Sequence, residues 1–203
     1  MILAIDTTHD QGSIALVEAG QVLEEVSLDG EDGFSSLLFI AIQDLLARHN
    51  ITLGAIDAFA AASGPGTFTG IRIGLTVAKG FGESMGKPVF GIGNLEALAT
   101  YAPGAIPFYD ARRGDVYTML ADGIERVLPF DQLPSLTAGN SHWVTFDPTL
   151  YPSLTATAAP RAIAAAIAKL AEARYLDGQR PDAAALDANY VRRSDAELNL
   201  RVT

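Results

Sequence analysis

The sequence predicts an α/β protein of two related lobes, each built on a mixed sheet. Three observations lead to this prediction. The chain opens with apolar and alternating runs that read as three antiparallel strands. Helical and strand patterns then alternate, and a second set of strands begins near Ile106. The order β-β-β-α-β-α followed by further strands is typical of two α/β lobes.

The first lobe is expected to span residues 1–103. Apolar residues recur with a helical period over 34–48, and a small-residue helix follows a buried apolar run. A turn at Gly20 joins two alternating runs into a hairpin. The expected elements are strands at 2–5, 13–17, 22–28, 56–62 and 89–92, and helices at 34–48, 70–84 and 95–101.

The second lobe is expected to span residues 104–203. Strands are predicted at 106–109, after the turn that follows Asp110, at 125–128 and at 142–146. An alanine-rich helix is predicted over 160–175, and this last helical segment is expected to pack back on the first lobe. No internal sequence repeat is found.

Composition excludes several classes of function. The chain has no cysteine, which excludes disulfides, thiolate catalysis and cysteine-ligated metals. It lacks a signal-like start and an apolar run of about 18 residues, so a cytoplasmic protein without a membrane span is expected. With a net charge of −10, the chain is not expected to hold RNA strongly by itself. Its one sequential basic patch, Arg192, Arg193 and Arg201, reads as a solvated tail.

Residues 63–80 carry the strongest local signal. A buried strand leads through Gly64, Gly66 and Gly70 into a helix, and such a corner can present backbone amides to an anion. No Gly-Lys-Ser/Thr sequence closes the loop, so it is not a Walker A motif. The alternative is a tight turn that binds nothing. The candidate nucleotide- or phosphate-binding residues are Asp6, Thr7, Thr8, Gly64, Gly66, Thr67, Thr69 and Arg72.

The helix after this loop has a stripe of small residues, Gly70, Gly74, Ala78 and Gly82. Glycine inside a helix costs about 1 kcal/mol relative to alanine, so close approach of another backbone is expected. That backbone is either the protein's own sheet or a helix of a partner subunit, and spacing alone does not choose. The helix over 34–48 is apolar on more than one face, since Phe39 and Ile40 lie away from its main stripe.

Asp6 follows a buried strand and precedes two threonines, which suits either a carboxylate that positions a metal-bound nucleotide or a simple turn cap. Asp110 and Asp115 flank two arginines and read as a hairpin turn. The sequence has neither a His-Glu-x-x-His pattern nor a Gly-x-Ser-x-Gly pattern. A zinc hydrolase and a serine hydrolase are therefore not expected, and no metal ligands are assigned.

Three segments together resemble the TsaB (YeaZ) family of bacteria. They are Ala4-Ile5-Asp6-Thr7-Thr8, the glycine segment from Gly64 to Gly74, and Asp110-Ala111-Arg112-Arg113-Gly114-Asp115-Val116-Tyr117. The ending Asn189-Tyr190-Val191-Arg192 is similar too. The resemblance marks Asp110, Arg112, Gly114, Asp115 and Tyr117 as a structural motif of the family.

The resemblance implies an actin-like/Hsp70-like ATPase (ASKHA) fold with a reduced second lobe. It implies a non-catalytic subunit that binds the catalytic TsaD, with a small ATPase, TsaE, completing the complex. This complex adds threonylcarbamoyl to adenosine 37 of tRNAs that read ANN codons, and tRNA would be contacted only indirectly. The resemblance further implies that no cofactor is bound tightly, with ATP or ADP at the partner interface. A homodimer through the same surface is expected when the partner is absent.

The implied interface is a bundle formed by the helices at 34–48 and 70–84. Its residues are Phe34, Leu37, Leu38, Ala41, Leu45, Gly70, Ile71, Gly74, Ala78, Phe81 and Gly82. A nucleotide-hydrolysing enzyme of the same superfamily, using Asp6 and the glycine loop, is the competing hypothesis. A glycoprotease-like peptidase has no support from the residues present.

Overall fold

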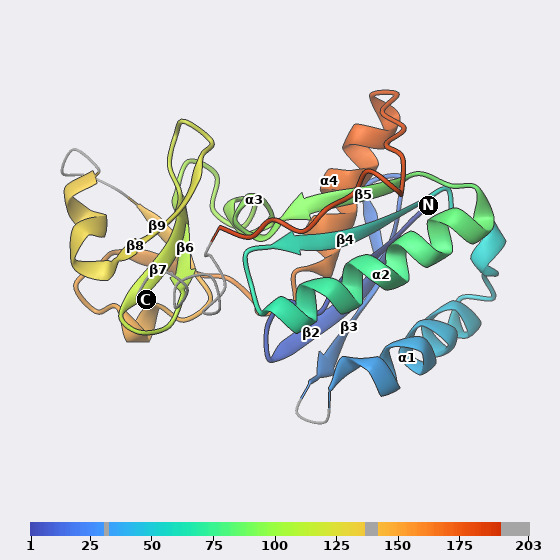
Figure 1. Cartoon of the computed structure of the whole chain (residues 1–203), viewed down its shortest axis with the longest axis horizontal. Helices are drawn as coiled ribbons and strands as arrows, with labels where there is room; N and C mark the ends of the chain where they lie inside the picture. The colour runs from blue at the N-terminus through green and yellow to red at the C-terminus, as the bar shows by residue number, and fades with distance from the viewer. Residues whose placement is uncertain (31–32, 137–141, 192–203) are drawn as a thin grey trace, which may run out of the picture.

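The first sheet has five strands, in the order β3-β2-β1-β4-β5 (Figure 1). The computed structural model describes residues 1–30, 33–136 and 142–191. Strands β1, β2 and β3 form an antiparallel meander, whereas β4 and β5 are parallel to β1. The strands are β1 (Ile2–Asp6), β2 (Gln11–Glu18), β3 (Gln21–Asp29), β4 (Ala58–Gly64) and β5 (Val89–Gly93).

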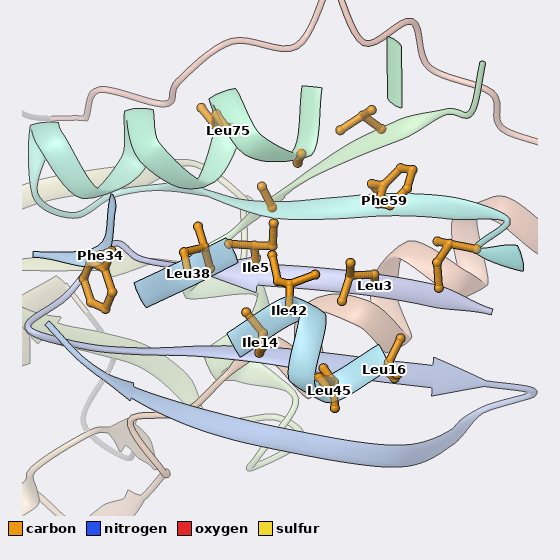
Figure 2. Packing of buried hydrophobic residues seen from close by; sticks show 14 of the residues in the cluster. Leu3, Ile5, Ile14, Leu16, Phe34, Leu38, Ile42, Leu45, Phe59 and Leu75 are labelled. Carbon is orange, nitrogen blue, oxygen red and sulfur yellow. The ribbon is translucent and has the colours of Figure 1, made fainter. Parts of the chain in front are cut away.

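Helices cover both faces of this sheet. Helices α1 (Phe34–Arg48) and α2 (Phe68–Met85) enclose one core with it, and Figure 2 shows Leu38, Ile42 and Leu45 of α1 pointing at the strands. Helix α4 (Ala164–Leu176) encloses a second core on the other face. Since both faces are buried, β1 and β4 read as continuous apolar runs, not as alternating ones.

The second sheet also has five strands, in the order β10-β9-β6-β7-β8. Strands β6, β7 and β8 form an antiparallel meander, and β9 and β10 continue the sheet in parallel. The strands are β6 (Ile106–Asp110), β7 (Asp115–Met119), β8 (Glu125–Pro129), β9 (Trp143–Thr145) and β10 (Ala156–Ala158). Helix α3 (Asn94–Ala99) packs between the two sheets, since Leu95 and Leu98 contact the second and Ala97 the first.

Short 3₁₀ segments complete the structure: η1 (Leu53–Ala55), η2 (Phe130–Leu136) and η3 (Pro148–Leu150). We call the first sheet with α1, α2 and α4 the first lobe, and the second sheet with η2 and η3 the second lobe. Figure 1 shows the lobes side by side with α3 between them.

Several predicted boundaries differ from those observed, and three of the starts shift for local reasons. The strand expected at 56–62 lies at 58–64, because the amide of Ile56 closes the η1 turn on Leu53 O. The helix expected from 70 begins at 68, where the Thr67 hydroxyl accepts a hydrogen bond from Gly70 N. The helix expected from 160 begins at 164. Its first amides donate to the Ser13 hydroxyl and the Glu25 carboxylate. The helix over 34–48 is confirmed at both ends.

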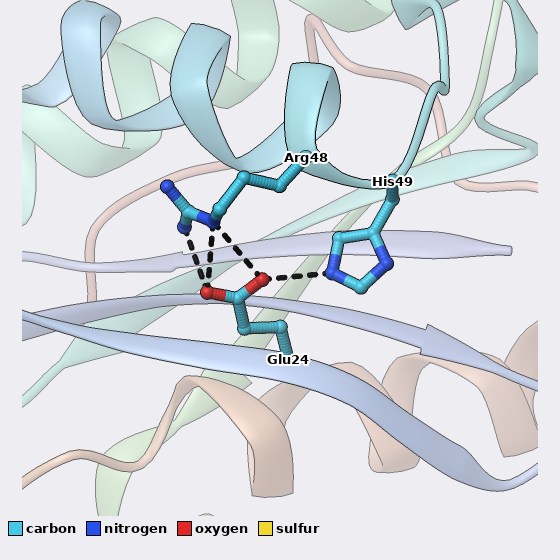
Figure 3. A network of polar contacts seen from close by, with 3 residues as sticks. All are labelled: Glu24, Arg48 and His49. Carbon is cyan, nitrogen blue, oxygen red and sulfur yellow. Dashed lines mark hydrogen bonds and ion pairs between the residues drawn. The ribbon is translucent and has the colours of Figure 1, made fainter.

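Glu24 on β3 ties the end of α1 to the sheet (Figure 3). Its carboxylate accepts from Arg48 Nη2 at 2.7 Å and lies 2.8 Å from His49 Nε2. These contacts lower the pKa of Glu24, with the Arg48 hydrogen bond as the larger cause. They fix the C-terminal end of α1 over the edge of the first sheet.

The segment after α4 runs back along α2 toward the second lobe (Figure 1). Ala183 is buried in the core beneath α2, and Lys79 Nζ donates to Leu186 O at 2.9 Å. Asn189 N donates to Ser63 O at 2.8 Å, beside the end of β4. The predicted basic residues Arg192, Arg193 and Arg201 lie outside the described residues.

Candidate functional site

The main apolar stripe of α1 is core, not free surface. Leu38 and Leu45 are fully buried and Phe34 nearly so, all against the first sheet. The prediction that Phe34, Leu38 and Leu45 belong to a partner interface is therefore wrong for most of their surface, which is buried in the protein's own core. Leu37 and Ala41 are half-buried at the edge of the same core.

The glycine stripe of α2 also faces the protein's own sheet. A Cβ atom on Gly70 would lie 1.9 Å from Thr7 O, and one on Gly82 would lie 2.1 Å from Val89 Cγ2. A Cβ on Gly74 would lie 2.8 Å from the Thr7 hydroxyl oxygen. The stripe thus lets α2 sit directly on the strand ends. The prediction that Gly70, Ile71, Gly74, Ala78 and Gly82 form a partner surface is wrong in this structure, because all five are buried there.

A different part of the same two helices remains open. A groove of about 700 Å³ runs between α1 and α2, and two of the predicted contact residues, Leu38 and Phe81, line it. Phe39 meets Phe81 edge-on, with ring centroids 6.1 Å apart. Phe39 is 55% exposed and Ile40, next to it, 62%. The remaining described lining residues are Ser35, Phe68, Thr69, Arg72, Ile73, Thr76, Val77 and Gly80.

Arg72 is the one charged side chain among the described residues that line this groove, so the surface is apolar and nearly uncharged. Contiguous apolar surface of this kind is typical of a docking site. The sequence does carry a signal for it. Positions 69, 73, 76 and 80 recur at intervals of four and three, a second helical face beside the glycine stripe.

The glycine loop before α2 closes on the protein's own chain. A Cβ on Gly66 would lie 2.6 Å from Thr8 O, and a Cβ on Gly64 would lie 2.8 Å from Asn189 O. Thr67 N donates to Thr8 O at 2.8 Å. The glycines are therefore explained by close approach of two neighbouring segments. Thr69 is exposed and lines the α1–α2 groove.

Asp6 caps its own turn. The side chain is fully buried, and its Oδ1 accepts from Thr8 N at 2.9 Å and from Thr8 Oγ1 at 2.6 Å. Asn94 Nδ2 donates to the same Thr8 hydroxyl, while the Thr7 hydroxyl donates to Gly70 O. Asp6 Oδ2 is buried and has no hydrogen-bond partner within the described part of the chain. The turn-cap interpretation thus accounts for Asp6 Oδ1 and Thr8, whereas the Thr7 hydroxyl bonds to the start of α2.

A second opening, the inter-lobe cleft, has a volume of about 1220 Å³. The end of β1 and the start of α2 line it from the first lobe, and the β6–β7 turn and the segment after β9 line it from the second. His9 lies in its wall, with its ring 5.1 Å from Tyr109 and 5.2 Å from Phe146. Burial lowers the pKa of His9 below 6.5, against the opposing effect of the Asp6 carboxylate.

The 110–117 motif forms the turn at the rim of this cleft. Ala111 N donates to Asp115 O and Asp115 N to Arg112 O, which closes the hairpin predicted there. Asp110 Oδ1 accepts from the backbone amide of Arg112, and Gly114 has a φ of 80°. Tyr117 is buried, 5.5 Å from the Tyr109 ring. The Tyr109 hydroxyl donates to Pro65 O and so joins the two lobes.

The described residues contain no cluster of three or more His, Cys, Asp or Glu side chains arranged to hold a metal ion. None of the described helices is both long and apolar enough to span a membrane.

Comparison with known proteins places this architecture. The chain is 37% identical to the Bacillus subtilis protein TsaB, named for tRNA threonylcarbamoyladenosine biosynthesis, over 123 residues covering 59% of this chain and 54% of that protein. It is 34% identical to Escherichia coli TsaB over 122 residues, covering 57% and 52%. The solved structure of YeaZ from Pseudomonas aeruginosa superposes with a TM-score of 0.75 at 26% identity, covering 93% of this chain and 98% of that one. Together these matches support membership of the TsaB (YeaZ) family.

A related family also matches part of the chain. The model described as TsaD, tRNA N6-adenosine threonylcarbamoyltransferase, matches residues 30–129. The predicted fold class is confirmed: an α/β protein with two mixed sheets and the actin-like arrangement of the YeaZ and TsaD families. The chain spans about half the length of the curated TsaB proteins it matches.

Proposed function

We propose that this chain takes part in the synthesis of threonylcarbamoyladenosine in tRNA as a non-catalytic subunit. It would bind a TsaD-like catalytic subunit that transfers the threonylcarbamoyl group to adenosine 37. The names of its TsaB relatives support the pathway. The burial of Asp6 beneath Thr8 supports the non-catalytic role, because this strand-end carboxylate is turned into its own turn.

The α1–α2 groove is the observation that carries the docking proposal. The TsaD family model matches residues 30–129, a range that includes all of α1 and α2. A TsaD-like partner would therefore present two helices of similar design. Two related helix pairs can meet face to face about a pseudo-two-fold axis, as identical ones do in an isologous dimer.

The chemistry of the groove fits such a partner. Its aromatic side chains, Phe39 and Phe81, are of a type enriched at interface cores, and Ile73 and Val77 add apolar surface. A second copy of this chain would bind to the same surface, so the chain would form a homodimer when the partner is absent. In this proposal ATP or ADP binds at the partner interface, and a TsaE-like ATPase joins the assembled pair.

The test is the mass of the mixture of this chain with the TsaD-like subunit, measured by light scattering after gel filtration. Wild-type protein should form a stoichiometric complex. Thr76→Arg should weaken it by at least about 3 kcal/mol, because an unpaired guanidinium would be buried in an apolar contact. Thr76 is exposed, so the isolated variant should keep its unfolding midpoint.

Leu176→Glu is the matched control. Leu176 is the most exposed large apolar side chain in the described structure at 74%, and it ends α4 on the opposite face of the sheet. Its variant should bind normally. Failure of the wild-type protein to associate, with and without nucleotide, would remove the proposal. Equal loss in both variants would show that the groove is not the contact.

A further inference from the structure

The inter-lobe cleft is rich in arginine. Four arginines and three aspartates line it among the described residues, whereas the whole chain carries a net charge of −10. The arginines come from distant parts of the sequence: Arg72 on α2, Arg112 and Arg113 in the β6–β7 turn, and Arg161 before α4. The fold therefore brings together four arginines from three separate parts of the sequence, and with the three aspartates the formal charge of the lining is +1.

Backbone groups engage two of the three carboxylates. Asp110 Oδ1 accepts from Arg112 N at 2.9 Å, and Asp147 Oδ1 accepts from Thr149 N at 3.0 Å. Asp10 lies 4.0 Å from an Arg112 guanidinium nitrogen, at a site where the Arg112 side chain is 73% exposed. An exposed contact of this length is weak, so the Arg112 guanidinium remains available to an incoming anion.

The turn that carries two of these arginines is built at a conformational cost. Arg112 has a φ of 65° and Arg113 a φ of 60°, so both adopt the left-handed backbone region. Residues with a Cβ pay about 1–2 kcal/mol each for that region, whereas glycine and asparagine adopt it readily. Outliers of this kind cluster at functional sites. Because glycine or asparagine would fit this turn at lower cost, the turn itself does not require arginine at positions 112 and 113.

Aromatic rings line the same cleft. Phe68 stacks on Tyr190 with ring centroids 5.3 Å apart, and the Arg72 guanidinium lies 3.9 Å from the centroid of the Phe68 ring. Arg72 Nε donates to the Tyr190 hydroxyl at 3.0 Å. Tyr190 remains 42% exposed. An exposed ring at the end of a stack is the kind of surface that accepts an unpaired base.

We propose that the inter-lobe cleft binds single-stranded RNA, with phosphates on Arg112 and Arg113 and a base stacked on Tyr190. A cationic groove beside aromatic rings is the general design of single-strand binding sites. The inference deepens the proposed function and rests on it for one point: the RNA expected there is the unpaired anticodon loop of a tRNA. It also revises the expectation that this subunit contacts tRNA only indirectly.

A free nucleotide fits the cleft less well. Pockets for small ligands usually measure about 300–1,000 Å³, and this cleft exceeds that range at about 1220 Å³. The loop that would hold a triphosphate closes on Thr8, and the Asp6 carboxylate is buried. The arginines lie on three separate elements, which suits successive phosphates along a chain.

The experiment measures binding of a fluorescent, unmodified tRNA anticodon stem–loop by fluorescence anisotropy over a range of salt concentrations. It uses the full chain alone and the chain in complex with its TsaD-like partner. The test variant is Arg112→Gly/Arg113→Asn, which removes two charges and supplies residues that favour positive φ, so the turn should be preserved. Lys169→Gln/Arg180→Gln removes two charges outside the cleft as the matched control.

Wild-type chain alone should bind the stem–loop in low salt, and affinity should fall as salt rises. The Arg112→Gly/Arg113→Asn variant should bind at least about tenfold more weakly, with the salt slope reduced by about 1.4, the value for two lost single-strand phosphate contacts. Tyr190→Leu should also weaken binding by about tenfold, while Tyr190→Phe, which keeps the ring, should not. The control variant should match the wild type.

Several results would overturn the inference. They are undetectable binding to the chain alone at low salt, equal affinity of the wild type and the Arg112→Gly/Arg113→Asn variant, equal binding of a fully paired RNA duplex, and complete displacement by ATP. The last result would assign the cleft to free nucleotides instead. Failure of this inference can be distinguished from failure of the proposed function. If the variant still forms the complex but RNA binding never depends on the cleft, only this inference fails; if the wild type never pairs, the docking proposal fails.

Discussion

The two lobes share one strand order but differ in what joins their strands. Read from the edge strand of the meander, the orders are β3-β2-β1-β4-β5 in the first sheet and β8-β7-β6-β9-β10 in the second. Each sheet is an antiparallel meander of three strands followed by two parallel strands. In the first lobe α1 and α2 fill the connections to β4 and β5. In the second, the described residues at the same places form only η2 and η3. Among the described residues, α-helices thus occupy these two connections in the first lobe and short 3₁₀ segments occupy them in the second.

The cores differ accordingly. The first sheet is covered mainly by aliphatic side chains from helices, such as Leu38 and Leu45. On the corresponding face of the second sheet, Phe108 of β6 and Trp143 of β9 form an aromatic cluster with Tyr151, which follows η3; the Phe108 ring centroid lies 5.6 Å from that of Trp143 and 4.8 Å from that of Tyr151. Large rings bury much area from short segments. In the second lobe, aromatic packing thus takes the place that helices α1 and α2 have in the first.

Phe108→Ala should have the largest effect, because it removes the fully buried ring at the centre of this aromatic cluster. We expect a loss of about 3–5 kcal/mol in the free energy of unfolding, measured in urea. Phe130→Ala, at the half-buried edge of the same cluster, should cost clearly less. Equal losses would contradict the view that Phe108 is the centre of the cluster that stabilises this face of the second sheet.

Gly70→Ala tests the contact that only the first lobe has, that of α2 on the strand ends. Its Cβ would meet Thr7 O at 1.9 Å, so the helix must shift, at a cost of about 2–3 kcal/mol. Gly80→Ala is the control on the same helix. Nothing lies within 4 Å of its Cβ position, and it should stabilise by up to about 1 kcal/mol. Thermal unfolding of both variants gives the comparison.

His9 allows a pH test of the junction between the lobes. Its folded pKa lies below the unfolded value of 6.5 because burial disfavours the charged ring. Between these two values the unfolded chain binds the additional proton, so stability falls as pH drops below 6.5. His9→Gln should flatten the unfolding midpoint between pH 7.5 and 5.5 relative to wild type. A variant with the wild-type slope would remove this role.

Glu24→Gln should have the smallest effect. It weakens the contacts of Glu24 with Arg48 and His49 at the end of α1, which are partly exposed to solvent. Such contacts contribute little and are screened by salt. The unfolding midpoint should shift slightly at low salt and not at high salt, and partner binding should be unchanged. A large loss would mean that α1 depends on this anchor more than on its buried face.

Sequence patterns predicted the local elements well and the long-range contacts poorly. The helical period fixed α1 at 34–48, because that period reports which side chains are buried. Glycine spacing correctly indicated a close backbone approach, but only the structure identifies the neighbour as Thr7. The order of the elements predicted two related lobes, but the strand order within each sheet was not predicted, since strand order depends on pairing and not on residue identity. The arginines of the cleft, spread from Arg72 to Arg161, could not be grouped from sequence for the same reason.

The central claim is that the α1–α2 groove is covered by a TsaD-like subunit, and single-cysteine labelling tests it most directly. The chain has no cysteine, so Thr76→Cys and Leu176→Cys each place one thiol, in the groove and on the far face. Alkylation rates of both variants would be measured with and without the partner. The account predicts that the partner slows labelling at position 76 at least about tenfold and leaves position 176 unchanged. Unchanged labelling at position 76 in a complex of confirmed mass would contradict it.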